Sequence, residues 1–455
     1  MTKMKYFGTD GVRGKVGKIL TVELALEIGK AAGAHIFKEY GEKSEKPFVV
    51  VGKDTRISSD LLESALIAGF CSRGVDVLSL GVVPTPAVAY ITRQMGAAAG
   101  IVISASHNPY FDNGIKLFGN DGFKIKDDME QQIEEILNYP EKLWSFPQPE
   151  EEKLGVILDN AEAPQKYIQY LRQTIDTDFN DIHIAIDCAN GATSKIAPKL
   201  FALLGAKVSV MGNSPDGINI NAGVGSTHPE ALAEFVKEVG ADIGFSFDGD
   251  GDRVIAIDEK GDVRDGDYIL FLCGQYLKEK GRLNQNTVVS TIMANLGFHR
   301  GLEDLGIRSI QTDVGDRYVA QAMLQGGYIL GGEQSGHVIF LEHSTTGDGL
   351  LTAIQFLEVL KFREVPFSQL SKVMNKLPQI LVNLKVNDKE QILGNPLLKE
   401  KELAIEEMLG SKGRLLLRPS GTEPLIRVMV EAETEEICRD VAHQILEVVK
   451  QILNK

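Results

Sequence analysis

The sequence predicts an α/β protein that is built from more than one domain. Short apolar, β-branched runs alternate with helical patterns through roughly the first four fifths of the chain, which is typical of parallel α/β units. The 46 glycines suit the turns at strand ends. A length of 455 residues exceeds the size of one hydrophobic core, so we expect two to four domains. The predicted buried strands are Phe48–Val51, Gly100–Ile103, Ile182–Ile186, Ile243–Phe247 and Val288–Ser290.

Two regions depart from this alternation. The stretch Tyr139–Glu152 is rich in proline and acidic residues, which predicts a linker and a boundary near Glu150. Near the C-terminus, the strand-like runs Arg414–Leu417 and Leu425–Val430 flank a turn and precede an amphipathic helix, Glu435–Leu453. We therefore expect this tail to form a small α+β module of its own.

Charge and cysteine content exclude several classes of partner. The formal net charge of −15 argues against nucleic acid and anionic membranes, which an acidic surface repels, so an anionic substrate would need local cations. The four cysteines form no Cys-x-x-Cys pair, so neither a disulfide framework nor a thiolate zinc site is indicated. The sequence is charged and glycine-rich from Met1 onward, and no apolar stretch is long enough to cross a bilayer. We expect a cytoplasmic protein without nucleic-acid or membrane partners.

The loop Ser104–Pro109 follows a predicted strand and carries the first candidate catalytic residue. Ser106 has His107 beside it and Lys116 nearby, which are the parts of an activated nucleophile or a phosphate carrier. A helix cap or a serine turn is the alternative for such a residue. The chain has no Gly-x-Ser-x-Gly elbow, so acyl transfer of the hydrolase kind is not indicated.

Asp248, Asp250 and Asp252 alternate with glycines directly after a predicted strand. Alternate residues of an extended segment project to one side, and three mutually repelling carboxylates there favour a bound cation. Hard oxygen ligands favour Mg²⁺ or Ca²⁺ over Zn²⁺. A solvated acidic turn is the alternative. An EF-hand is excluded, because Arg253 stands where its loop requires glycine and both flanks are predicted strands.

A third loop, Gly331–His337, is a glycine-rich turn after a short apolar run. Its Glu333, Ser335 and His337 could present acceptors and donors to sugar hydroxyls. A tight hairpin with incidental polar residues is an equally good interpretation.

Two further segments could bind phosphate. In Arg418–Pro424, an arginine, two hydroxyls and the backbone N–H groups of a glycine turn form an anion nest, although a rigid turn between strands is the alternative. Phe7–Gly14 could supply another phosphate-facing arginine, Arg13. The chain has neither a Walker A loop nor a Gly-x-Gly-x-x-Gly after a strand, so ATP, GTP and NAD are not implied.

Taken together, these loops resemble the α-D-phosphohexomutase family, and most closely its phosphoglucosamine mutase branch. The signatures occur in the family's order along almost the whole chain: Phe7–Gly14, Ser104–Pro109, Asp248–Arg253, Gly332–His337 and Arg418–Pro424. The resemblance implies three similar mixed-sheet α/β domains and a smaller C-terminal α+β domain around a central cleft. With the linker above, we expect the domains at residues 1–152, 153–256, 257–368 and 369–455.

The resemblance also implies roles for individual residues. Ser106 would carry a phosphoryl group, and its activating phosphate would share one Mg²⁺ per subunit with Asp248, Asp250 and Asp252. His107, Lys116 and Arg253 are unranked candidates for acid/base or charge-stabilising roles. The residues expected to bind substrate are Arg13, Glu333, Ser335, His337, Arg418, Ser420, Gly421 and Thr422.

The branch, and with it the sugar, rests on softer features. These are Gln334, Ser104 where glucose and mannose relatives usually have threonine, and the segments Asn219–Asn221 and Gly225–His228. The expected reaction interconverts glucosamine 6-phosphate and glucosamine 1-phosphate through a 1,6-bisphosphate, supplying amino-sugar nucleotide and cell-wall precursor synthesis. The alternatives are a mutase for glucose or mannose phosphate, a metal-dependent phosphatase that uses Ser106, and a non-catalytic phosphosugar-binding protein. A homodimer is also suggested by the resemblance.

Overall fold

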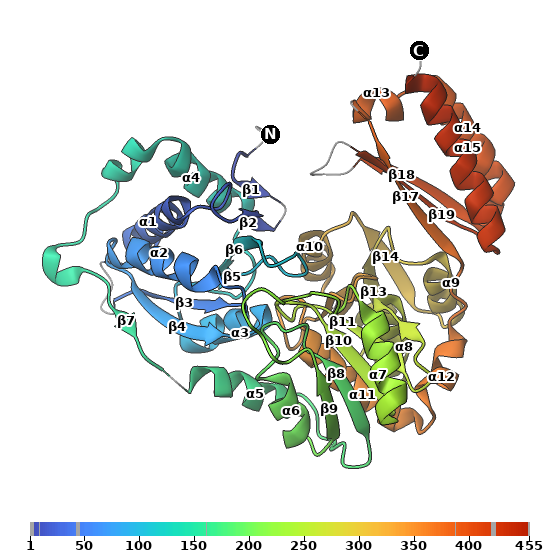
Figure 1. Cartoon of the computed structure of the whole chain (residues 1–455), viewed down its shortest axis with the longest axis horizontal. Helices are drawn as coiled ribbons and strands as arrows, with labels where there is room; N and C mark the ends of the chain where they lie inside the picture. Colours follow the sequence, from blue (N-terminus) through green and yellow to red (C-terminus); the bar gives the residue numbers. More distant parts are fainter. Residues whose placement is uncertain are drawn as a thin grey trace. The chain divides into compact units, whose positions relative to one another are not determined.

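A computed structural model describes residues 4–8, 10–41, 46–160, 162–386, 388–419 and 425–453 (Figure 1). The chain divides into two compact units. The first comprises residues 1–292 and 307–371, and the second comprises residues 293–306 and 372–455.

The first sheet is mixed and, within the described residues, has seven strands in the order β1-β2-β6-β5-β3-β4-β7. Strands β3, β4, β5 and β7 are parallel, whereas β6, β2 and β1 continue the sheet antiparallel. The bounds are β1 Phe7–Gly8, β2 Gly11–Lys15, β3 Phe48–Lys53, β4 Asp76–Val82, β5 Ala99–Ile103, β6 Asp112–Gly119 and β7 Ile157–Leu158.

Helices cover both faces of this sheet, which explains why its central strands are apolar throughout. Val49 and Val51 of β3 pack in one buried cluster with residues of α1 (Val22–Tyr40) and α2 (Ser59–Cys71). On the opposite face, a Cβ added to Gly52 would lie 2.5 Å from Val88 of α3 (Thr85–Met95), so α3 packs closely against the strand. Figure 1 shows α2 and α3 on opposite sides of β3.

Two further mixed sheets complete the first unit. In the described residues, their orders are β12-β11-β10-β8-β9 and β14-β13-β15-β16. The strands are β8 His183–Asp187, β9 Lys207–Met211, β10 Ile243–Phe247, β11 Val254–Asp258, β12 Val263–Arg264, β13 Thr287–Thr291, β14 Arg308–Thr312, β15 Leu330–Gly332 and β16 Val338–Phe340. Helix α4, Asp127–Asn138, belongs with the first sheet. The other helices of the first unit are α5 Ala163–Gln173, α6 Ala197–Leu203, α7 Pro229–Val239, α8 Gly266–Glu279, α10 Asp316–Gly326, α11 Gly349–Arg363 and α12 Phe367–Leu370.

The three sheets share a feature that positions the site. In each, a strand of the parallel core is followed by a polar loop and then by an antiparallel return strand: β5 to β6, β10 to β11, and β15 to β16. The three connecting loops are those that carry Ser106, the three aspartates and Glu333. The chemistry-bearing loops therefore occupy equivalent places in three similarly built domains.

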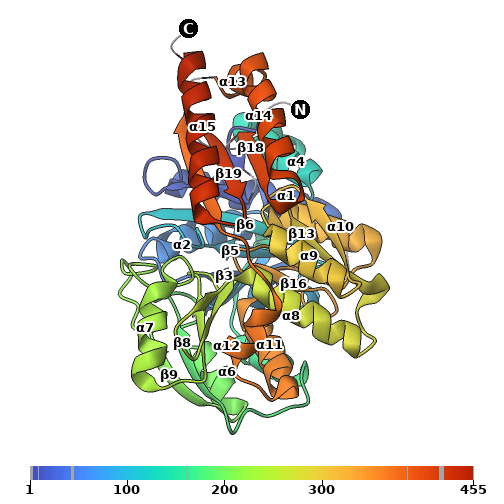
Figure 2. The ribbon, with the colours of Figure 1, turned by 90° about the vertical axis from the view of Figure 1, so that its right-hand side faces the viewer.

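The second unit is a small α+β module, as the sequence predicts. Its described sheet has the antiparallel order β17-β19-β18, with β17 Gln379–Lys385, β18 Arg414–Pro419 and β19 Leu425–Glu431. Its helices are α9 Leu296–Asp304, α13 Lys389–Leu393, α14 Pro396–Leu409 and α15 Glu435–Leu453, and α14 and α15 lie side by side (Figure 2). Glu431 joins the parts of this unit, because it pairs with Arg414 at 2.7 Å and accepts the N–H of Leu296 at 2.9 Å.

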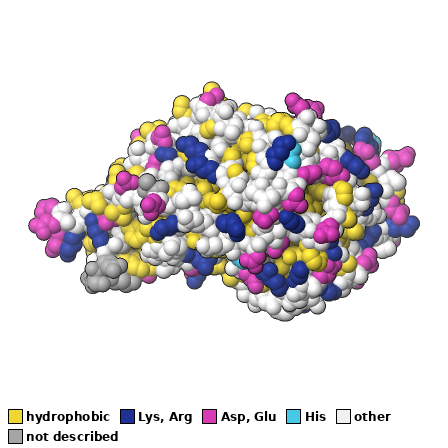
Figure 3. Space-filling model, turned by 90° about the horizontal axis from the view of Figure 1, so that it is seen from below, with side chains coloured by type: hydrophobic (Ala, Val, Ile, Leu, Met, Phe, Trp, Pro, Cys, Tyr) yellow, Lys and Arg dark blue, Asp and Glu magenta, His cyan; other side chains and the backbone are white. Residues whose placement is uncertain are grey.

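The five predicted buried strands and the three elements of the predicted tail are confirmed. The predicted linker contains only short 3₁₀ turns, at Pro140–Ser145 and Glu151–Lys153, and the chain then returns to the first sheet through β7. The proposed boundaries after residues 152, 256 and 368 stay predictions. None of the helices in the described ranges has the length and apolar character of a membrane span. Acidic and basic side chains are interspersed on the face shown in Figure 3.

Candidate active site

Ser106 is held in an unusual backbone conformation at the end of β5. Its φ is +52°, in the left-handed region, and the residue is 2% exposed. Its N–H donates to Ser104 Oγ at 2.9 Å, and that hydroxyl donates to Asp54 Oδ2 at 2.6 Å. Its carbonyl accepts from Arg56 Nη2 at 3.0 Å and from Asn221 Nδ2 at 2.9 Å. Such strain costs about 1–3 kcal/mol and persists where the surroundings fix it, as they do here.

The Ser106 hydroxyl meets the aspartate loop directly. Its Oγ donates to Asp248 Oδ2 at 2.6 Å and lies 3.3 Å from His107 Nδ1. Asp248 follows β10 and Ser106 follows β5, so strand ends of two different sheets bring the two groups together. The predicted meeting of these two loops is therefore observed.

Three buried carboxylates converge beside this serine. They form the aspartate triad, Asp248, Asp250 and Asp252, whose exposed fractions are 0%, 1% and 7% and whose potential ligand oxygens lie within 4.8 Å of one another. A Cβ added to Gly249 would lie 2.6 Å from the carbonyl oxygen of Ser106, so glycine allows the loops to approach. Gly251 has a φ of +71°, which favours glycine.

Lys116 offsets part of the triad's negative charge, and Thr85 donates a hydrogen bond to one of its carboxylates. Lys116 Nζ lies 3.0 Å from Asp250, 3.1 Å from Asp10 and 3.6 Å from Asp252, and Thr85 Oγ1 donates to Asp250 Oδ2 at 2.7 Å. Burial would raise the pKa of Asp250, but the charge of Lys116 and the hydrogen bonds from Thr85 and Lys116 together lower it. For Asp248, burial and then the other two aspartates raise the pKa well above its usual value. The triad is thus incompletely neutralised by the protein.

The triad fits a hard divalent cation. Oδ1 of Asp250 and Oδ1 of Asp252 are buried and have no hydrogen-bond partner among the described residues. Leaving such an oxygen without a partner costs free energy, so these atoms are suited to coordinate a cation. Since all the converging groups are carboxylates, the donor set favours Mg²⁺ over softer metals.

His107 and Arg253 also lie next to Ser106 and the triad. The Arg253 N–H donates to Asp248 Oδ1 at 3.2 Å, and its Nη1 lies 3.3 Å from His107 Nδ1. Burial and the adjacent Arg253 lower the pKa of His107 to about 4, so the imidazole is neutral near pH 7. Because a guanidinium only donates, Nδ1 of His107 is the accepting nitrogen. Arg253 stays cationic, since the triad raises its pKa despite burial.

A cavity of about 240 Å³ opens next to these groups. It is lined by Asp10, Arg13, Ser106, Asp252, Arg253, Val314, Gly315, Asp316, Arg317, Tyr318, Glu333 and His337. Of the predicted site residues in the first unit, it brings together Arg13, Ser106, Asp252, Arg253, Glu333 and His337. Of the others, His107, Lys116 and Asp248 contact lining residues directly, and Asp250 pairs with Lys116.

The predicted sugar loop is only partly in this lining. Glu333 Oε1 accepts the N–H of Gly315 at 3.1 Å, and His337 Nε2 accepts the N–H of Gly347 at 3.2 Å. Ser335, on the same turn, is exposed and lies outside the lining. The fixed position of Glu333 supports a binding role more directly than the placement of Ser335 does.

Arg418 lies near the end of β18 in the second unit. Ser420, Gly421 and Thr422 lie outside the described residues. The phosphate-binding role of this loop therefore stays a prediction.

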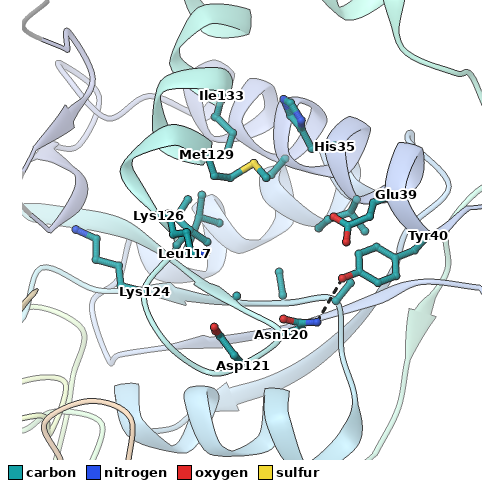
Figure 4. Close-up of a pocket in the computed structure, with 16 residues that line it drawn as sticks. His35, Glu39, Tyr40, Leu117, Asn120, Asp121, Lys124, Lys126, Met129 and Ile133 are labelled. Atoms are coloured by element: carbon teal, nitrogen blue, oxygen red, sulfur yellow. Dashed lines mark hydrogen bonds between the residues drawn. The ribbon is translucent and has the colours of Figure 1, made fainter. Parts of the chain in front are cut away.

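A larger cavity, of about 350 Å³, lies on the first sheet between α1, α4 and β6 (Figure 4). Leu117 lines it, whereas the preceding residue, Lys116, contacts Asp250, so β6 separates this cavity from the triad. Tyr40 and Asn120 at its edge are joined by a 3.3 Å hydrogen bond. With neither Ser106 nor a triad aspartate in its lining, it is not the site of the predicted chemistry.

Several site residues were not singled out from the sequence. Thr85 begins a helix and carries no motif, so only the fold reveals its contact with Asp250. Asp54 and Arg56 lie in a polar loop after a predicted strand. A loop in this position often lies near a ligand, so the sequence does carry a signal for these two residues. Asp316 begins α10 directly after the loop that follows β14, so the same rule indicates it.

The fold and the site together define a phosphohexomutase-type protein. Family models described as phosphoglucomutase/phosphomannomutase alpha/beta/alpha domains I, II and III match residues 4–143, 165–261 and 265–377. The model of the C-terminal domain matches residues 381–448. The chain belongs to the phosphoglucomutase/phosphomannomutase family, which confirms the resemblance and the expected domain types.

The sequence relatives are more specific. A phosphoglucosamine mutase from Bacillus mycoides (strain KBAB4) is 56% identical over 446 residues, covering 98% of each chain. A phosphoglucosamine mutase from Bacillus cereus (strain AH187) is 55% identical with the same coverage.

Solved structures share the fold over nearly the full chain. A phosphoglucomutase/phosphomannomutase family protein from Burkholderia thailandensis has a TM-score of 0.81 at 26% identity, covering 99% of this chain and 98% of that one. The Aspergillus fumigatus N-acetylphosphoglucosamine mutase, solved in complex with GlcNAc-6P and magnesium, has a TM-score of 0.70 at 17% identity, covering 99% and 96%. The second likeness is one of fold.

Proposed function

We propose that the chain is an isomerase that interconverts glucosamine 6-phosphate and glucosamine 1-phosphate, the activity for which its Bacillus relatives are named. The observation that carries the proposal is the 2.6 Å contact between Ser106 Oγ and Asp248, next to a cavity lined by Glu333 and His337. A carrier hydroxyl, a carboxylate cluster and a polar cavity meet there.

The reaction consists of two phosphoryl transfers through one serine. In the first, the bond between phosphorus and Ser106 Oγ breaks and a bond to O1 of glucosamine 6-phosphate forms; the O1 hydroxyl proton passes to a base, and Ser106 Oγ takes up a proton. The 1,6-bisphosphate then turns over in the site. In the second transfer, the phosphoryl group on O6 moves to Ser106 Oγ, which gives up its proton, while O6 takes up a proton; this regenerates the phosphoserine and leaves glucosamine 1-phosphate. No phosphate is lost to water in the cycle.

The protein groups supply position and charge, which is what phosphoryl transfer chiefly requires. A phosphorylated Ser106 would carry about −1.5 to −2 charge at neutral pH. Asp248, Asp250 and Asp252 would hold one Mg²⁺ per subunit with an oxygen of that phosphate, and the bound ion would neutralise charge on the transferring group. Lys116 acts as a fixed cation, since burial opposes its charge but the adjacent carboxylates raise its pKa well above the usual value.

Among the three candidates, His107 is the one that is uncharged near pH 7 and can therefore accept a proton. Its imidazole is neutral near pH 7, because burial and Arg253 lower its pKa to about 4, and its Nδ1 lies 3.3 Å from Ser106 Oγ. A neutral imidazole can take a proton at this atom, which a permanently cationic Arg253 cannot. We assign charge stabilisation to Arg253.

Substrate binding is divided between two regions in this proposal. Arg13, Glu333 and His337 line the cavity and can contact the sugar or a phosphate, with Ser335 on the same turn as Glu333. Arg418, Ser420, Gly421 and Thr422 would hold the non-reacting phosphate. Because the bisphosphate reverses its direction, this loop must accept the phosphate at either end of the sugar. A hinged C-terminal module would help it to do so.

The remaining features of the proposal follow from the family resemblance. The enzyme would work in the cytoplasm, as a homodimer, and would supply amino-sugar nucleotide and cell-wall precursor synthesis. A phosphoglucomutase or phosphomannomutase activity of the same site is the second candidate, favoured by the names of the matching domain models.

A substrate panel tests the proposal. We expect kcat/KM for glucosamine 6-phosphate to exceed the values for glucose and mannose phosphates, with activity that requires Mg²⁺. Ser106→Ala should abolish turnover, whereas Ser64→Ala, an exposed serine on α2, should not. Retained activity of Ser106→Ala would refute the carrier role, and a preference for glucose or mannose phosphate would refute the sugar assignment.

A further inference from the structure

We propose that Asp316 gives the site its preference for an amino sugar, by pairing with the C2 ammonium group of the substrate. The inference rests on the proposed function, because it concerns recognition by the same cavity. Asp316 is the first residue of α10, after the loop that follows β14, and it lines the 240 Å³ cavity together with Ser106 and Arg253. A carboxylate here faces the space that a substrate of Ser106 must enter.

The position of Asp316 is fixed by its neighbours. The preceding Gly315 has a φ of +137°, a conformation that favours glycine, and its N–H donates to Glu333 Oε1 at 3.1 Å. Asp316 Oδ1 accepts the N–H of Arg317 at 2.8 Å. One carboxylate oxygen of Asp316 is therefore held by a hydrogen bond, and the backbone just before Asp316 is held by the predicted sugar loop.

The charges around the cavity leave Asp316 without an ionic partner. Among the lining carboxylates, Asp10 pairs with Arg13 at 2.9 Å, and Asp252 pairs with Arg253 at 3.9 Å. Asp316 makes no ion pair among the described residues, and its second oxygen, Oδ2, accepts no hydrogen bond there.

The neighbouring charged groups are engaged elsewhere. Arg317, the closest cation in sequence, pairs with Asp127 at 3.1 Å and stacks on the Tyr318 ring at 4.8 Å. Glu333 accepts the backbone N–H of Gly315, and its charge contributes to the raised pKa of Arg253. Asp316 and Glu333 are thus the two lining carboxylates without an ion pair among the described residues, and Glu333 already interacts with the charge of Arg253. Asp316 is therefore the carboxylate whose charge a substrate cation would best balance.

The chemistry of the competing sugars matches this arrangement. Glucosamine phosphate carries a protonated amine at C2, where glucose and mannose phosphates carry a hydroxyl. A carboxylate can accept a hydrogen bond from either group, but only the ammonium adds the attraction between two full opposite charges. Because the bisphosphate reverses its direction, the proposal requires C2 to face Asp316 in at least one of the two orientations.

The test compares substrates in one variant. Asp316→Asn keeps the shape and the acceptor for the Arg317 N–H but removes the charge. We expect kcat/KM for glucosamine 6-phosphate relative to glucose 6-phosphate to fall about tenfold or more, because a neutral amide attracts the ammonium much less than a carboxylate does, whereas the neutral hydroxyl of glucose loses less. Asp313→Asn, an exposed aspartate of the same loop, serves as the matched control and should leave the ratio unchanged.

The outcomes separate this inference from the proposed function. An unchanged substrate ratio in Asp316→Asn, or an equal loss with both sugars at unchanged thermal stability, would overturn the role of Asp316 while wild-type turnover of glucosamine 6-phosphate still supported the function. Absence of that wild-type turnover would overturn both. A selective loss for the amino sugar would support the pairing.

Discussion

Thr85→Val isolates one contact of the proposed metal site. Thr85 is 1% exposed, its Oγ1 donates to Asp250 Oδ2 at 2.7 Å, and its backbone N–H donates to the Asp250 carbonyl at 2.9 Å. Valine has nearly the same shape, so the substitution removes only the hydroxyl. Asp250 would keep Lys116 and the backbone contact, but its carboxylate would be less firmly oriented with Oδ1 toward a cation.

The expected loss follows from this one hydrogen bond. A bond to a charged group contributes about 1.5–3 kcal/mol, and each 1.4 kcal/mol is a factor of about ten. Groups that orient metal ligands typically contribute about 10–100-fold to metal affinity or activity. We therefore expect the Mg²⁺ concentration for half-maximal turnover to rise about 10–100-fold in Thr85→Val, with a smaller change in kcat at saturating Mg²⁺. Initial rates across an Mg²⁺ titration measure both quantities.

Thr92→Val is the matched control. Thr92 lies on the same helix, is fully buried, and donates its Oγ1 to the Val88 carbonyl at 2.7 Å within α3. This variant loses a buried hydroxyl of the same kind, so we expect a change in Tm without a change in Mg²⁺ dependence. The same Mg²⁺ dependence for wild type and Thr85→Val would refute the role of Asp250 as an oriented metal ligand.

Three further outcomes are expected. Burial raises the pKa of Asp348 to about 7, so the folded state binds more protons than the unfolded chain between pH ~4 and ~7. Stability from this group therefore falls as pH rises through that window, and Asp348→Asn should flatten the Tm profile there; an unaltered profile would contradict it. Lys116→Met leaves buried carboxylates unpaired, which should lower Tm and make Mg²⁺ raise Tm more than in the wild type, as thermal melts would show. Gly249→Ala places a Cβ 2.6 Å from the Ser106 carbonyl oxygen, so kcat should fall at least about tenfold, and near-normal rates would refute the close packing.

The sequence predicted what depends on local spacing. The aspartate triad is recognisable because three carboxylates alternate with glycines directly after an apolar strand, and the structure places them around one point. Ser106 is recognisable for a similar reason, at the end of β5. The strands were predicted from short apolar runs. A strand that is covered on both faces is apolar at successive positions and does not alternate with polar residues.

Features that depend on how sheets are joined were not predictable. Thr85 reaches Asp250 from a helix that is 165 residues away in the chain, and Asn221 reaches the Ser106 carbonyl across 115 residues. Thr85 has no local pattern that distinguishes it from an ordinary helix terminus. Asn221 belongs to a segment that indicates the branch, but nothing local predicts its contact with Ser106. The exposure of Ser335 likewise depends on the direction of the turn after β15, which the residue types do not determine.

The proposed mechanism requires Ser106 to pass its phosphoryl group to the sugar. The most direct test loads Ser106 with a radiolabelled phosphoryl group from a labelled hexose 1,6-bisphosphate and then adds unlabelled glucosamine 6-phosphate with Mg²⁺. We predict that the label leaves the protein and appears in sugar phosphates, with glucosamine 1-phosphate among the products. Label that stays on the protein, or that appears as inorganic phosphate without isomerised sugar, would contradict the account.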